Sequence, residues 1–178
     1  MNGNRAAVSA DPKSVAVRSI QLMASGTRAD FDDAIHPDGF TRERRAAPPS
    51  ARGNGPGAFY ELALWLRGAI ADLSYEIHHA VAEGELVTVN STMNGRHTAP
   101  LVFYTEQGEV DAGFAPTGKS FAITQSHWFR MKDGKIIEHW ANRDDLGMAR
   151  QLGWIPPTPA YLLRCAQVKR RARKALTV

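Results

Sequence analysis

Residues 119–144 read KSFAITQSHWFRMKDGKIIEHWANRD, and this stretch decides the fold. Apolar and polar side chains alternate on both sides of Asp133-Gly134, a dipeptide that is typical of two-residue hairpin turns. The pattern predicts two long antiparallel strands, from Lys119 to Met131 and from Lys135 to Asp144.

The segments upstream extend this hairpin into a larger sheet. Residues 73–82 and 86–98 alternate around the turn Glu83-Gly84-Glu85, and residues 101–105 suit a short strand. Helical patterns come before them, over residues 12–26 (with Asp11 as N-cap), 30–40 and 57–71, and a short one follows over residues 145–152. This order predicts an α+β fold, a curved antiparallel sheet wrapped around helices to form a cone with an internal pocket.

Two segments are predicted to be irregular. His36-Pro37-Asp38-Gly39 combines strong turn formers and indicates a turn at the end of the second helical pattern. Residues 41–57, with four arginines, three prolines and three glycines, are expected to form a surface loop or lid.

The composition is that of a globular protein. Of the 178 residues, 43% are hydrophobic, which is enough to bury a core without metals or disulfides. The single cysteine, Cys165, excludes an intramolecular disulfide and suits a reducing cytoplasm. The sequence has no secretory signal pattern and no apolar run of about 20 residues, so we expect a cytoplasmic protein without a membrane partner.

Charge separates the C-terminal segment from the rest of the chain. The formal net charge is +4, but residues 161–178 carry six cations and no acidic side chain, so residues 1–160 have a net charge of −2. We therefore expect residues 1–12 to be a flexible segment, residues 13–157 to form the domain, and residues 158–178 to be a basic tail that is helical in part. A solvated tail explains this charge better than a nucleic acid partner does.

Several short motifs carry a resemblance to a known family. They are GRHT at 95–98, PTGK at 116–119, DGKI at 133–136, EHW at 138–140, DDLG at 144–147 and QLG at 151–153. Their order resembles the SnoaL-like family of polyketide and ester cyclases, which has the nuclear-transport-factor-2-like fold. The chain departs from the family pattern in extra residues between His97 and Pro116, in Asn90 and Ala99, and in its basic tail.

The resemblance implies a cofactor-free aldol catalyst that closes a ring on a hydrophobic, polyketide-like molecule, and a homodimer. In the family an aspartate four residues after the tryptophan serves as acid and base, and here this is Asp144. A histidine on a neighbouring strand assists, and His127 and His97 are the positions that match.

Strand periodicity gives a second view of the same site. Alternation in residues 135–144 puts Trp140, Asn142 and Asp144 on one side, which we expect to face the pocket. Burial there would raise the pKa of Asp144, while Asp145 would cap the following helix; the reverse assignment, with Asp144 as the cap, stays open. The other residues expected to contact the substrate are Phe129, Gln125, Phe59 and Tyr75.

Other classes of site have less support. The six histidines and one cysteine do not fall into a metal-ligand spacing, and the sequence has no GxGxxG, P-loop or GxSxG motif, so we expect neither a metal nor a cofactor. Two alternatives to the cyclase remain, a non-catalytic small-molecule binder and an epoxide hydrolase or hydroxylase on the same fold. Hydrolysis would require an arginine and a second carboxylate in the pocket, and alternation puts Arg130 and Arg143 on the faces opposite His127 and Asp144.

Overall fold

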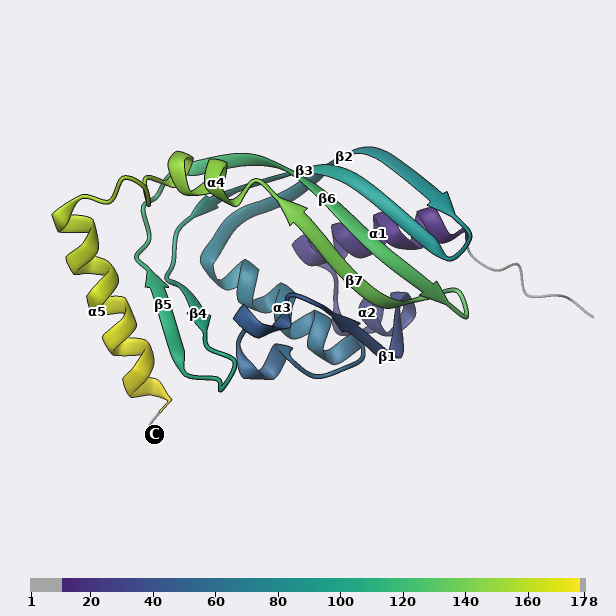
Figure 1. The fold of residues 1–178 in the computed structure, drawn as a ribbon, viewed down its shortest axis with the longest axis horizontal. Coiled ribbons are helices and arrows are strands. Elements are labelled where there is room, and N and C mark those ends of the chain that lie inside the picture. Colours follow the sequence, from purple (N-terminus) through teal and green to yellow (C-terminus); the bar gives the residue numbers. More distant parts are fainter. Residues whose placement is uncertain (1–10, 177–178) are drawn as a thin grey trace, which may run out of the picture.

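The computed structural model describes residues 11–176, and residues 1–10 of the predicted flexible segment lie outside this range. Its main feature is a curved five-stranded sheet in the order β1-β7-β6-β3-β2. Figure 1 shows this sheet arching over the helices, with a two-stranded sheet of β4 and β5 at one end. The α+β class and the wrapped sheet are confirmed.

Three helices fill the concave side of the sheet, and local sequence sets where each begins. Helix α1 (Pro12–Ser25) starts at Asp11, whose carboxylate accepts hydrogen bonds from the backbone N–H groups of Lys13 and Ser14, as predicted. Helix α2 (Arg28–Ala34) starts with a capping box between Thr27 and Asp30. Helix α3 (Pro56–Ala69) has a proline in its first turn, where a missing N–H costs nothing.

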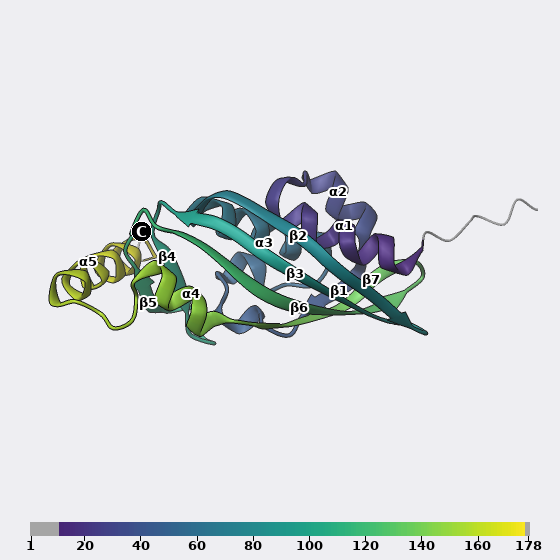
Figure 2. The same cartoon turned by 90° about the horizontal axis from the view of Figure 1, so that it is seen from above.

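The four long strands lie where alternation predicted them. They are β2 (Ile70–Glu83), β3 (Leu86–His97), β6 (Ser120–Lys132) and β7 (Lys135–Arg143), and each neighbouring pair among β2, β3, β6 and β7 is antiparallel. Asp133 and Gly134 both have positive φ, as a two-residue turn of this kind requires. Figure 2 shows these strands as one twisted layer.

Two strands were not predicted. Strand β1 (Ile35–Thr41) contains the segment expected to be a turn; it pairs in parallel with β7, with a register shift between Ile35 and Phe40 that accommodates Pro37 and Gly39. Strand β5 (Val110–Phe114) pairs with β4 (Leu101–Tyr104). Residues 42–55 then include two short 3-10 turns, Arg44–Ala46 and Pro49–Ala51, before α3 begins.

A β-bulge in β7 decides which of its side chains point into the fold. Near the turn Met131 pairs with Ile136, but the next pair is Arg130 with Glu138, so Ile137 is an extra residue in β7. Beyond it, Phe129 pairs with His139 and His127 with Ala141. Directly opposed residues share a face of a sheet, so His139, Ala141 and Arg143 lie on the concave face with His127.

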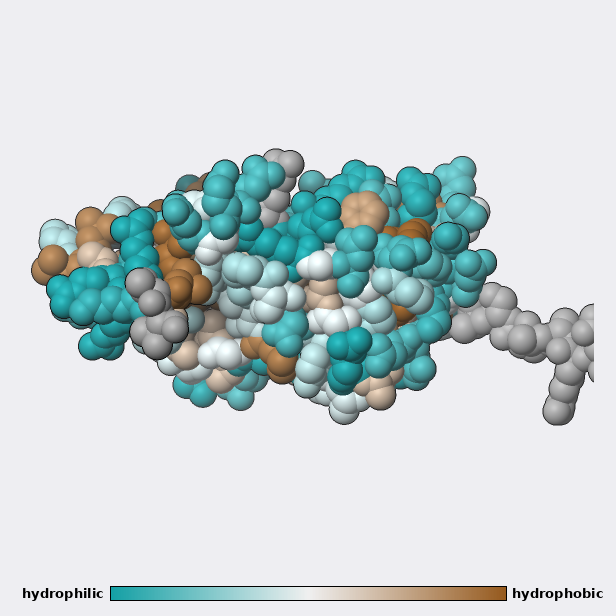
Figure 3. All heavy atoms as spheres, turned by 90° about the horizontal axis from the view of Figure 1, so that it is seen from below, coloured by the Kyte–Doolittle hydropathy of each residue, from teal (hydrophilic) through white to brown (hydrophobic). Residues whose placement is uncertain are grey.

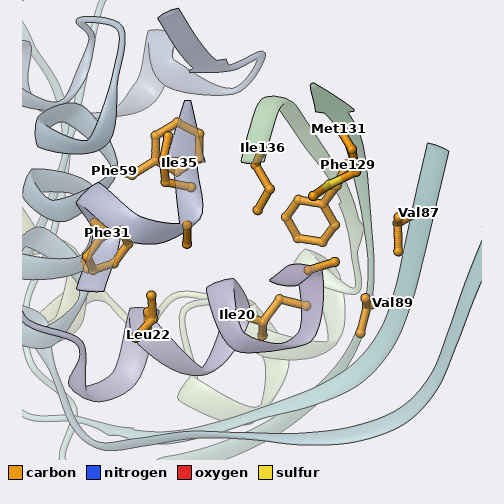
Figure 4. Packing of buried hydrophobic residues seen from close by; sticks show 13 residues of the cluster. Ile20, Leu22, Phe31, Ile35, Phe59, Val87, Val89, Phe129, Met131 and Ile136 are labelled. Atoms are coloured by element: carbon orange, nitrogen blue, oxygen red, sulfur yellow. The ribbon is translucent and has the colours of Figure 1, made fainter. Parts of the chain in front are cut away.

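The main core lies between α1 and the concave face of the sheet. In Figure 4 the side chains of Ile20, Phe129 and Ile136 point toward one another from these two layers, and Val87 and Val89 approach from β3. All five are at most 2% exposed. Burying a side chain of this size stabilises the fold by about 1.5–3 kcal/mol, so this cluster fixes the position of α1 under the sheet.

The chain ends in two helices outside the sheet. Helix α4 (Asp145–Leu152) stops at Gly153, which has φ of 71°, as the sequence predicted. Helix α5 (Pro159–Ala175) packs against β5 through Tyr161, Cys165 and Val168. Figure 3, viewed from below, shows brown hydrophobic atoms among teal ones at the α5 end, where Leu162 and Leu163 are exposed. Within residues 11–176, no helix combines the length and apolar character needed to cross a membrane.

Candidate active site

A cavity of about 550 Å³ opens between the helices and the concave face of the sheet. This volume lies in the range of cavities that hold drug-sized ligands. Most of the wall is apolar. Its aromatic members are Phe31, Phe59, Trp65, Tyr75, Phe103, Phe114, Phe129 and Trp154.

One wall carries a continuous string of polar side chains. His127 Nε2 lies 2.7 Å from Gln125 Oε1, and His127 Nδ1 lies 3.0 Å from His139 Nε2. At the far end, His139 Nδ1 lies 3.1 Å from the hydroxyl of Thr41. Because each ring nitrogen has one neighbour, a neutral tautomer of each histidine can donate one hydrogen bond and accept one.

Both imidazoles are held in the neutral form. Burial lowers the pKa of His127 well below 6.5, with the neighbouring His139 and Arg143 acting in the same direction. Burial, with a smaller contribution from Arg143, lowers the pKa of His139 to about 3. Near pH 7 the pair therefore acts through neutral N–H donors and N acceptors, as an imidazole does when it polarises a carbonyl group.

A charged cluster lies on the same wall, beside the histidines. One oxygen of the Glu43 carboxylate accepts a hydrogen bond from the backbone N–H of Ala141, and the other lies 2.8 Å from a guanidinium nitrogen of Arg143. Glu43 and Arg143 line the cavity and are both about one-third exposed at their side chains. Asp145, at the start of α4, is the other carboxylate that lines the cavity in the described part of the chain.

The sequence placed five side chains correctly. His127, Gln125, Phe129, Phe59 and Tyr75 all line the cavity. Burial also raises the pKa of the Tyr75 hydroxyl, so it stays protonated as a donor. Their roles in binding and catalysis stay predictions.

Three side chains of the predicted site lie elsewhere, because the bulge at Ile137 reverses the alternation in the rest of β7. Trp140 and Asn142 are on the convex face, where Trp140 stacks on Trp128 and lies 3.9 Å from the guanidinium of Arg42. Asp144 is exposed, and its carboxylate accepts a 2.8 Å hydrogen bond from the backbone N–H of Gly147. The assignment of the two aspartates was therefore wrong: Asp144 caps α4, and Asp145 lines the cavity.

His97 is also separated from the cavity. Its side chain is fully buried and packs edge-on against Trp154, with 5.4 Å between the ring centroids. At this point Trp154 forms the cavity wall. Burial lowers the pKa of His97, so the ring is a neutral part of the core.

Sequence reasoning missed His139, Arg143 and Glu43. The first two follow from the bulge, which adds one residue and leaves no clear mark in the sequence. Glu43 lies in the segment expected to be a surface loop or lid, and no residue of that segment was assigned to the pocket. Among the described residues, no group of three histidine, cysteine, aspartate or glutamate side chains could hold a metal ion.

Relatives with assigned activities cover most of the chain. The aklanonic acid methyl ester cyclase DnrD of Streptomyces peucetius is 31% identical over 144 residues, which is 80% of this chain and 90% of that protein. The nogalonic acid methyl ester cyclase of Streptomyces nogalater is 32% identical over 135 residues, 75% of this chain and 91% of that protein.

Solved structures show the same fold at lower identity. TsrD of Streptomyces laurentii superposes with a TM-score of 0.64 at 21% identity, covering 79% of this chain and 92% of its own. AclR of Streptomyces galilaeus, described as a putative hydroxylase, has a TM-score of 0.59 at 20% identity, covering 95% and 96%. The profile of the SnoaL-like polyketide cyclases matches residues 13–152. This chain belongs to the SnoaL-like polyketide cyclase family.

Proposed function

We propose that the protein closes a ring by an intramolecular aldol addition on a hydrophobic polyketide ester, without a cofactor. The observation that carries this proposal is the pair of neutral imidazoles, His127 and His139, on the wall of an apolar cavity. The relatives that act on methyl esters of polyketide acids support an ester as the substrate.

The reaction requires three things from the protein. It must hold a flexible side arm of the substrate against the carbonyl carbon that it attacks, and an apolar cavity does this while it limits the access of water. It must supply a donor to the carbonyl oxygen as negative charge develops there, and His127 Nε2–H, now bonded to Gln125, is placed for this. It must also take a proton from the carbon that attacks. A C–H bond and a C=O π bond are exchanged for a C–C bond and an O–H bond, so no redox partner is needed.

The test is incubation of the purified protein with aklanonic acid methyl ester in the presence of a metal chelator. We expect a product of unchanged mass with one more ring, identified by liquid chromatography, mass spectrometry and NMR. His127→Phe, which keeps a ring in the cavity but removes both nitrogens, should lower the rate at least about 100-fold. Tight binding of the ester, followed by fluorescence of Trp65 and Trp154, with no turnover would instead identify a non-catalytic binder.

One observation favours a second candidate, the addition of water to an epoxide. Such a site uses an arginine and carboxylates, and Arg143, Glu43 and Asp145 all line the cavity. The sequence had put Arg143 on the face opposite His127, and the bulge in β7 overturns that expectation. Assays with an apolar epoxide separate the two functions, because hydrolysis adds one water to the mass and ring closure adds nothing.

We also propose that the protein is a cytoplasmic homodimer. The convex face of the sheet supports a dimer, because it presents the stacked pair Trp128 and Trp140 beside a shallow hollow lined by Leu86 and Arg130. The lone thiol of Cys165 is compatible with a reducing compartment. Light scattering after size exclusion should give twice the chain mass at micromolar concentration, and a strict monomer would contradict the dimer.

A further inference from the structure

The segment of residues 42–55 brings a carboxylate into the cavity and is fastened in place there. Arg52 donates hydrogen bonds to the carbonyl oxygens of Ala47 at 2.9 Å and of Thr105 and Glu106 at 2.7 Å, which ties the segment to the β4–β5 hairpin. At its other end, the N–H of Arg42 bonds to the carbonyl oxygen of His139 on β7. Glu43 is thus held between two anchored points.

The Glu43 carboxylate lies where the wall of β7 lacks a functional group. Ala141 is the residue between His139 and Arg143 on the concave face, and its methyl group can neither accept nor give a proton. The backbone N–H of Ala141 binds one oxygen of Glu43, and Arg143 binds the other. Each carboxylate oxygen has two lone pairs, so these contacts leave the group able to accept a proton.

Glu43 is also the carboxylate that connects to the histidines. Its second oxygen lies 3.4 Å from the hydroxyl of Thr41 and 4.0 Å from His139 Nδ1, and the Thr41 hydroxyl lies 3.1 Å from that same nitrogen. A path of neighbouring polar atoms therefore runs from Glu43 through Thr41 and His139 to His127. Asp145, the other carboxylate on the cavity wall in the described part of the chain, is exposed at the start of α4.

We propose that Glu43 is the catalytic carboxylate that takes the carbon-bound proton, and that Thr41, His139 and His127 return a proton to the new alkoxide. This inference rests on the proposed ring closure. The C–H bond breaks, its proton goes to Glu43, and its electrons form an enolate. The enolate carbon then forms the new C–C bond, while the C=O π electrons of the attacked carbonyl move to its oxygen. His127 Nε2 gives its proton to that oxygen. His127 Nδ1 then takes one from His139 Nε2, His139 Nδ1 takes one from Thr41, and Thr41 takes one from Glu43.

After each turnover Glu43 and Thr41 have regained their starting protonation states. His127 and His139 remain neutral, but each has its proton on the other ring nitrogen. Exchange with water restores them after the product leaves, since the Glu43 side chain is about one-third exposed. Thr41 and His139 are positioning residues in this scheme, because they act through Glu43 and His127. The lowered pKa of both histidines agrees with a chain of neutral imidazoles.

The test separates proton removal from ring closure. In D2O, NMR follows exchange of the hydrogens beside the ester carbonyl, in aklanonic acid methyl ester and in a β-keto methyl ester that bears a naphthyl group and cannot cyclise. Glu43→Gln keeps an oxygen for the Ala141 N–H but cannot take the proton, and we expect exchange to fall at least about 100-fold. Asp144→Asn, a carboxylate change outside the cavity, is the matched control and should exchange at the wild-type rate.

Two further variants sharpen the result. Thr41→Val should slow ring closure more than it slows exchange, because it interrupts the return of the proton. The amide of Glu43→Gln must fit beside Arg143, and Glu43→Ala avoids this requirement. Acetate added to Glu43→Ala should restore part of the exchange. Folding of each variant is checked by circular dichroism and by its melting temperature.

Each outcome decides one of the two proposals. If the wild type exchanges but forms no ring, and Glu43→Gln stops exchange, the ring closure is wrong and the role of Glu43 stands. The role of Glu43 is wrong if the wild type does not exchange above the buffer rate. It is also wrong if Glu43→Gln, or Glu43→Ala without acetate, exchanges at the wild-type rate, or if the loss follows Asp145→Asn instead.

Discussion

Replacing Asp144 tests whether its carboxylate stabilises a helix or takes part in chemistry. The structure places it at the N-cap of α4, exposed, with a 2.8 Å hydrogen bond from the N–H of Gly147. Asparagine caps helices about as well as aspartate does, whereas alanine loses the bond and costs about 1 kcal/mol. Asp144→Asn should therefore be close to neutral, and Asp144→Ala should lower the melting temperature by about 2–4 °C for a chain of this size.

Gly147 gives a second way to disturb the same cap. A Cβ at this position would lie only 2.0 Å from one oxygen of Asp144, so Gly147→Ala must displace the carboxylate. In an exposed helix, Gly→Ala normally stabilises by about 1 kcal/mol. Losing the Asp144 cap costs a similar amount. We therefore expect Gly147→Ala to leave the free energy of unfolding almost unchanged, although replacing a helical glycine would normally raise it.

The assays are urea denaturation, for the free energy of unfolding, and the initial rate of ring closure. We expect Asp144→Asn, Asp144→Ala and Gly147→Ala to keep kcat within a factor of about 3 of the wild type, because all three changes lie outside the cavity. A fall of about 100-fold in kcat for Asp144→Asn with an unchanged melting temperature would refute it. The carboxylate of Asp144 would then act on the substrate, as the sequence had suggested.

Three further predictions concern stability. The folded state holds His139 neutral, because burial lowers its pKa from 6.5 to about 3. The stability that this residue contributes is therefore fully present above about pH 6.5. Below that pH, the free energy of unfolding falls by up to about 1.4 kcal/mol per pH unit for this residue. Urea titrations from pH 7.5 to 4.5 should show this slope in the wild type and a smaller one in His139→Gln, and equal slopes would contradict it. Gly55→Ala should destabilise by about 1–3 kcal/mol, because φ is 84° and the Cβ would lie 2.6 Å from the carbonyl oxygen of Pro37. The exposed Gly68→Ala in α3, with nothing within 4 Å of its Cβ, should stabilise and is its matched control in thermal melts. Arg67→Ala should cost about 2–3 kcal/mol by removing charged donors from the carbonyl oxygens of Leu22, Met23 and Gly26 at the end of α1, and Arg67→Lys should recover only part of this in the same melts.

The sequence predicted well those features that depend on local pattern. Three kinds of feature depend on only a few neighbouring residues, and each is found in the structure. They are the strand alternation in residues 119–144, the turn at Asp133-Gly134, and the helix ends at Asp11 and Gly153. Strand β1 was missed because Pro37 and Gly39 favour a turn locally, and only pairing with β7 makes this segment a strand. Long-range pairing of this kind is not contained in a local pattern.

The candidate site was harder to predict than the fold. The residues placed correctly, such as Gln125 and His127, lie on β6, where alternation is uninterrupted. A tight two-residue turn without a bulge would have put Trp140 opposite His127, which is the arrangement the sequence suggested. The position of Glu43 depends on contacts between its segment and distant parts of the chain, and no spacing in the sequence reveals them.

The extra residue in β7 has a consequence for how such proteins diversify. The outer half of this strand carries two alternative sets of side chains, one aromatic and amide, the other imidazole and guanidinium, and both are already present in the chain. Pairing Ile137 with Arg130 in a regular ladder would slide the outer half by one residue and exchange the sets, whereas deleting Ile137 would keep the present pairs. The chemistry of the interior therefore depends on whether this strand bulges, and comparisons of relatives should locate the bulge before they compare identities.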